Sequence, residues 1–198
     1  MPRLSHRAKI IVIFIVILIL GSGLFAFLQA QSKVPTSFTQ ARAQGAIIAQ
    51  NIVTLSDQST ANLEKVNQYD KEGDYTDALT LTTTVAGQSQ QLRDQAVELS
   101  NQVSDMTQAL SSISSFPAQQ AALEAISSRL ALINELVNYS GDLGKLLDVL
   151  RAHFTGQSQN DTQVQALVNQ INTDVNAINN FNAQANASMN QFDKLMGQ

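Results

Sequence analysis

The residues that most often carry catalysis or metal binding are scarce in this chain of 198 residues. It has no cysteine and two histidines, and His153 is the only histidine outside the basic N-terminal segment. A zinc or iron site built from histidine and cysteine is therefore excluded, and no phosphate-binding or serine-hydrolase motif occurs. We expect His153, near the end of a helix, to interact with the C-terminus of that helix. The sequence predicts a protein that is not an enzyme and needs no cofactor or metal.

Four carboxylates surround Gly73. They are Asp70, Glu72, Asp74 and Asp77. Their spacing lacks the ordered Asp-x-Asn-x-Asp-Gly loop of an EF-hand, so we interpret them as a solvated acidic turn, with weak Ca²⁺ binding as the alternative.

Small residues indicate one candidate ligand site. Gly87 and Gly144 fall at nearly the same height on two neighbouring predicted helices, and Ser59 and Ile171 are expected at that height on the other two. Such a layer could leave a cavity for a small ligand inside a helical bundle. The alternative is that these residues only let the helices pack closely.

Asparagines repeat along one face of the last predicted helix, where they could contact a partner helix or glycans. They are Asn169, Asn172, Asn176, Asn179, Asn186 and Asn190. A neutral, solvated helix face is the alternative interpretation.

Four segments with heptad-like spacing of apolar residues carry all of these side chains. The predicted helices span about 36–71, 74–114, 117–155 and 160–196. In the third, a predicted buried seam comprises Leu123, Ile126, Leu130, Ile133, Val137, Leu147 and Phe154, and a second seam lies beside it. The short turns force neighbouring helices to be antiparallel. The sequence therefore predicts an all-α protein, with an antiparallel up-down four-helix bundle over residues 36–198.

Residues 10–28 form an uncharged, apolar run of 19 residues. As a helix it would be about 28 Å long, which matches the ~30 Å hydrocarbon core of a bilayer. Arg3, Arg7 and Lys9 precede it, so we expect residues 1–9 in the cytoplasm, a transmembrane anchor over 10–28, a linker over 29–35, and the bundle outside the cell membrane. The alternative is a signal peptide cleaved near Ala30, which would give a secreted protein.

The charge balance limits the classes of partner that the chain can bind. The net charge of −4, less the three cations before the apolar run, leaves −7 for the rest, which argues against a nucleic-acid partner. We expect a membrane-anchored interaction or scaffold component of a prokaryotic cell envelope. Its partners would be the lipid bilayer through residues 10–28 and an envelope protein or a second copy.

Two alternative functions remain open. One is a small-ligand sensing bundle that relays to a separate membrane partner, a layout that resembles the four-helix ectodomains of chemoreceptors. The other is a structural spacer in a surface layer or appendage.

Overall fold

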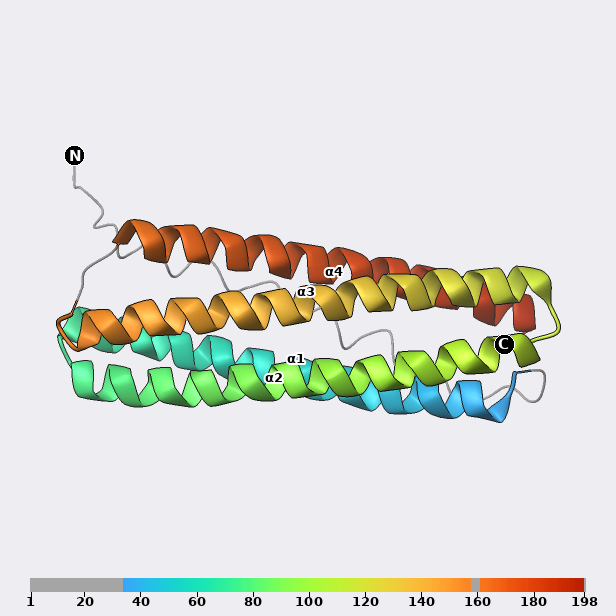
Figure 1. Cartoon of the computed structure of the whole chain (residues 1–198), viewed down its shortest axis with the longest axis horizontal. Helices are drawn as coiled ribbons and strands as arrows, with labels where there is room; N and C mark the ends of the chain where they lie inside the picture. Colours follow the sequence, from blue (N-terminus) through green and yellow to red (C-terminus); the bar gives the residue numbers. More distant parts are fainter. Residues whose placement is uncertain (1–33, 158–160, 198) are drawn as a thin grey trace.

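Four long helices make up the described part of the chain. The computed structural model describes residues 34–157 and 161–197, and these contain no strand. The elements are α1 (Thr36–Glu72), α2 (Tyr75–Ala109), the short 3₁₀ turn η3 (Leu110–Ser112), α3 (Phe116–Phe154) and α4 (Asp161–Met196). Successive long helices lie side by side and run in opposite directions (Figure 1). The prediction of an all-α, four-helix protein is confirmed, and at ~1.5 Å per residue the rod is about 55 Å long.

The predicted anchor is not tested by these helices. Across residues 34–157 and 161–197, no helix combines the length and the apolar character that a membrane crossing requires. Residues 1–9 and 10–28, and most of the predicted linker 29–35, lie outside the described residues.

The helix ends follow local backbone chemistry. Gly73 ends α1 in the left-handed conformation, with φ of 77°, and its N–H donates to the Asp70 carbonyl oxygen. The Asp74 carboxylate accepts from the Asp77 N–H at 3.2 Å and so caps α2. Pro117 lies in the first turn of α3, where its missing N–H costs nothing. Hereafter the end of the rod that contains Gly73 is called the tip, and the opposite end the base.

The α-helical part of α2 ends earlier than the expected residue 114. It stops at Ala109, the chain tightens into η3, and Ile113 is extended, with φ of −86° and ψ of 120°. The Gln119 side chain explains this early end, because its Nε2 donates to the carbonyl oxygens of Leu110 and Ile113 at 3.2 and 2.6 Å. These carbonyls thus find a partner without a further helical turn.

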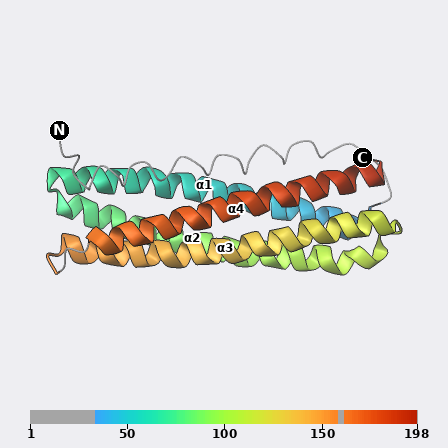
Figure 2. The ribbon, with the colours of Figure 1, turned by 90° about the horizontal axis from the view of Figure 1, so that it is seen from above.

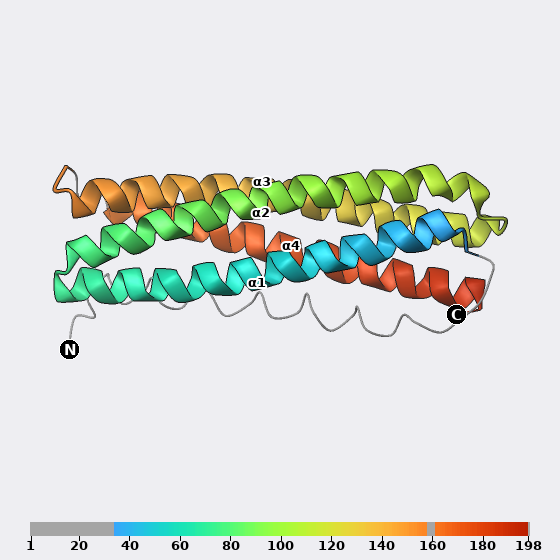
Figure 3. The same ribbon diagram turned by 90° about the horizontal axis from the view of Figure 1, so that it is seen from below.

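The four helices do not close evenly around their core. The pairs α1/α2, α2/α3 and α3/α4 pack along their lengths, whereas the backbones of α1 and α4 hardly approach each other. Figures 2 and 3 show α4 close to α3 near the tip and crossing α1 near the middle of the rod. Side chains connect α1 and α4 at the base. There Arg42 forms a two-pronged ion pair with Asp193, at 2.7 and 2.9 Å, and the rings of Phe38 and Phe192 lie 5.1 Å apart. We call the space between these two helices the α1–α4 seam.

The apolar face of α3 is wider than the surface that its neighbours cover. Leu123 and Leu130, which were expected in the buried seam, are 52% and 48% exposed, so that expectation is wrong for both. Their neighbours Ala122 and Ile126 are buried instead, at 0% and 2%. Residues that repeat every seven positions drift by about 20° per heptad around a straight helix. A strict seven-residue repeat along α3 therefore does not stay on its buried face.

Candidate ligand-binding site

The predicted small-residue layer is only partly inside the bundle. Ser59 and Ile171 are fully buried, and the Ser59 hydroxyl donates to Gln88 Oε1 at 3.2 Å. Gly144 is half-buried and Gly87 is exposed, and a Cβ added at either would meet no atom within 4 Å. Gly87 lies between the buried positions 85 and 89 and therefore points to the opposite side of α2. Its expected place in an interior layer is wrong, and the cavities described below are lined by other residues.

Three of the four acidic side chains at the tip, those of Asp70, Glu72 and Asp74, have partners within the protein. The His153 Nε2 atom lies 3.1 Å from Asp70 Oδ1, which links α3 to α1, and its ring makes edge contacts with Tyr75 and Phe154. Glu72 accepts a hydrogen bond from Gln68, in addition to the cap that Asp74 supplies. Among the described residues, no three acidic or histidine side chains are grouped so that they could hold a metal ion.

The asparagine stripe divides into two rows along α4. Asn169, Asn176 and Asn190 are exposed, whereas Asn172, Asn179 and Asn186 are half-buried. Asn179 and Asn186 line cavities in the α1–α4 seam. The inner row therefore borders the seam, and the outer row faces solvent.

Three cavities open along the seam. One lies near the middle of the rod and has a volume of about 40 Å³; we call it the middle cavity. A smaller one of about 10 Å³ lies beside it on the side of the tip. They share Ile52 of α1, Leu136 of α3 and Ile178 of α4, so their walls are continuous. The third, also about 40 Å³, lies nearer the tip, and apolar side chains such as Leu63 and Phe154 make up most of its lining.

A positive charge lines the middle cavity. Arg129 extends from α3 across to α1, where its Nη1 atom is 3.7 Å from the position that a Cβ on Gly45 would occupy. Burial, reinforced by the nearby positive charge of Arg42, lowers the pKa of Arg129 to about 10. Within residues 34–157 and 161–197, the structure records no hydrogen bond or ion pair to this guanidinium.

Sequence reasoning missed Arg129, although a signal was present. It lies three residues after Ile126 and four before Ile133, on the buried face of α3. A charged residue at such a position departs from the amphipathic pattern, and departures of this kind are expected at functional sites.

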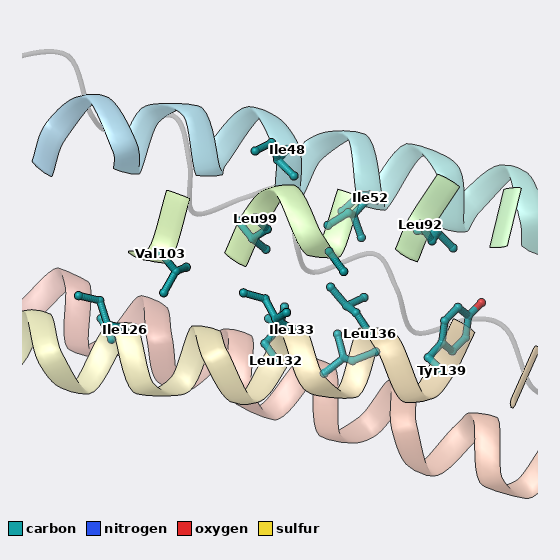
Figure 4. Packing of buried hydrophobic residues seen from close by; sticks show 14 of the residues in the cluster. Ile48, Ile52, Leu92, Leu99, Val103, Ile126, Leu132, Ile133, Leu136 and Tyr139 are labelled. Atoms are coloured by element: carbon teal, nitrogen blue, oxygen red, sulfur yellow. The ribbon is translucent and has the colours of Figure 1, made fainter. Parts of the chain in front are cut away.

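Two further polar groups are buried in or next to the seam. Tyr139 is 1% exposed, and its hydroxyl has no hydrogen-bond partner in the described part of the chain. Asp174 of α4 is 2% exposed; its Oδ1 accepts from Gln170 at 2.9 Å, whereas its Oδ2 has no such partner. Burial raises the pKa of both side chains. Figure 4 shows Ile52 and Leu136 facing each other, with the Tyr139 hydroxyl pointing away from α3.

Comparison of the chain with models of known protein families, with curated proteins and with solved structures finds no match. The site must therefore be interpreted from its own residues. They form two continuous, mostly apolar cavities bordered by one cation, one phenol and the amides of Asn182 and Asn186, an arrangement that could bind a small molecule.

Proposed function

We propose that the chain is a membrane-anchored, extracytoplasmic helical bundle that serves as an interaction or scaffold component of the cell envelope, without enzymatic activity. Residues 10–28 anchor it in the cytoplasmic membrane, with residues 1–9 inside. The rod holds its surfaces away from the bilayer, where an envelope protein or a second copy binds.

The observation that carries this proposal is the combination of an apolar, membrane-length run with a long rod of four helices. A second observation supports it. The polar groups that could have formed a reactive cluster act as structural partners instead, as in the pairs Asp70–His153 and Arg42–Asp193. A rod whose polar groups are used in this way is suited to presenting surfaces rather than to chemistry.

Photo-crosslinking in intact cells tests this function. A crosslinking residue placed at Asn176 or Asn190, on the exposed row of α4, should give a discrete adduct that stays with the membrane fraction. The same residue at the exposed Gln90 of α2 is the matched control. Loss of the chain from membranes would contradict the anchor. Membrane-bound chain that forms no adduct from either α4 position would contradict the interaction.

The second candidate function is small-ligand sensing with relay to a membrane partner. The continuous cavities of the α1–α4 seam favour it, because a ligand there would contact both α1 and α4. The backbones of these two helices hardly approach each other, so a ligand between them could change their separation. A ligand that binds the purified chain should alter the crosslinks from Asn176 or Asn190, and unchanged crosslinks would count against the relay.

A further inference from the structure

We propose that the middle of the α1–α4 seam binds a small organic acid, whose carboxylate pairs with Arg129 and whose apolar chain lies over Ile52, Leu136 and Ile178. This inference rests on the second candidate function, ligand sensing, and names the class of ligand.

The first step concerns charge. Arg129 places a guanidinium in the wall of the middle cavity, and no carboxylate of the described residues pairs with it. Its charged neighbour Arg42 is also positive, and the carboxylate nearest to Arg42 is already held in a two-pronged ion pair. Arg129 is half-buried, so an anion that enters this cavity meets a partly desolvated cation for which the described residues supply no counter-ion.

The second step concerns the geometry of that anion. A guanidinium presents two parallel N–H donors that match the two oxygens of a carboxylate. Asn182 and Asn186 add amide groups to the same cavity wall. The other walls are apolar, which disfavours a strongly hydrated ion such as phosphate and favours a carboxylate attached to a hydrocarbon chain.

The third step concerns the hydrocarbon chain of the ligand. A water molecule needs roughly 10–15 Å³ of such space, so the middle cavity, of about 40 Å³, has room for a carboxylate and little more. The three shared residues lead from there into the smaller cavity, where Tyr139 places a second polar group without a partner. Buried polar groups are normally paired, and the Tyr139 hydroxyl is buried without a partner among the described residues. Together with the half-buried Arg129 it borders two continuous apolar cavities, the arrangement of a pocket that a ligand completes.

Binding of simple acids to the full chain tests this site. The chain would be reconstituted in lipid nanodiscs, and its thermal unfolding followed by circular dichroism during titration with acetate, butyrate or hexanoate. We expect the unfolding midpoint to rise in a saturable manner with the longer acids, because a ligand of the folded state alone stabilises it. Hexanamide has the same chain without the charge, and should leave the midpoint unchanged.

Variants assign the effect to the site. Arg129→Gln should abolish the response, whereas Arg93→Gln, which removes an exposed arginine of α2, should retain it. Arg129→Lys keeps the charge but loses the paired donors, and should weaken binding about tenfold or more. Ala49→Leu fills the cavity from α1 and should also prevent binding, so the test does not depend on Arg129 variants folding.

Three outcomes would overturn the proposal: no response to any of the acids, equal responses to hexanoate and hexanamide, or a wild-type response from Arg129→Gln. The scaffold function is judged separately by the crosslinks in cells. If the acids do not bind but the crosslinked adducts still form in cells, only the acid-binding site is contradicted. If the acids bind but the chain does not stay with the membrane fraction, only the membrane anchor is contradicted.

Discussion

Ser89 of α2 and Ser140 of α3 each bind the backbone of the other. The Ser89 hydroxyl donates to the Ser140 carbonyl oxygen at 3.1 Å, and the Ser140 hydroxyl donates to the Ser89 carbonyl oxygen at 2.9 Å. Both side chains are buried. Side chains as small as these let the two helix backbones come close enough for such reciprocal bonds. The pair therefore fixes the relative height of α2 and α3.

Enlarging Ser140 should force these helices apart. We expect Ser140→Leu to lower the free energy of unfolding by ~1–3 kcal/mol through overpacking, and Ser140→Ala to lower it by about 1 kcal/mol through the lost hydrogen bond. Urea unfolding of the full chain measures both. The control is Ser127→Leu, at an exposed position of the same helix, which should change little. Equal effects of leucine at 127 and 140 would contradict the close contact.

The stability of the bundle should depend on the protonation of Asp174. Burial raises its pKa above the ordinary value, and the hydrogen bond from Gln170 opposes this. Three charged residues of α3 also act on this carboxyl: Asp142 and Glu135 raise its pKa, and Lys145 lowers it. A raised pKa means that the folded state holds the proton more tightly than the unfolded state. The stabilisation from this group is thus complete below its unfolded pKa of about 3.8 and is lost as the pH rises through the folded pKa.

Asp174→Asn isolates that contribution. Because the ionised carboxylate has a buried oxygen without a hydrogen-bond partner, the variant should be more stable than wild type at pH 7. The difference in free energy of unfolding between the two proteins should shrink as the pH falls toward 4. Urea unfolding at several pH values measures it. Asp57→Asn, on the exposed face of α1, serves as the control, and a variant less stable than wild type at pH 7 would refute the assignment.

The two leucines left outside the bundle should contribute little to its stability. We expect Leu123→Ala and Leu130→Ala to change the free energy of unfolding by no more than ~0.5 kcal/mol. Ile126→Ala, between them on the same helix, should cost about 2–5 kcal/mol because Ile126 is 2% exposed. Comparable losses at positions 123 and 126 in denaturant unfolding would show that the outer face of α3 is covered.

These leucines also show how far the sequence could predict the fold. The spacing of apolar residues and the turn at Gly73 predict four helices and their order, because periodicity and capping are local. Which side of a wide apolar stripe is buried depends on the neighbouring helices. The sequence could not decide between Leu123 and Ala122 for the inner position, because two adjacent apolar residues fit the same pattern.

The site was less predictable than the fold. Gly87 and Gly144 are small, but a cavity depends on where the helices fail to meet, and that is a property of all four helices together. The open side of this bundle lies between α1 and α4, the helices most distant in sequence. Arg129 was the residue that the pattern could have revealed, since a charge on a buried helix face needs an explanation.

Arg129 should destabilise the chain when no anion is bound. Its guanidinium is half-buried near Arg42, and no carboxylate of the described residues pairs with it. Arg129→Met keeps the length of the side chain and removes the charge, so it should raise the free energy of unfolding by about 1 kcal/mol, the lower end of the gain from replacing buried ionic groups by apolar ones, because Arg129 is only half-buried. Urea unfolding in a buffer without carboxylates measures the change, and Arg93→Met provides the exposed control. A large loss of stability in Arg129→Met would show that the guanidinium has a structural partner, and would leave the acid site without its basis. A gain would show that the arginine is kept at a cost in stability, which is the pattern expected when a residue serves binding rather than folding.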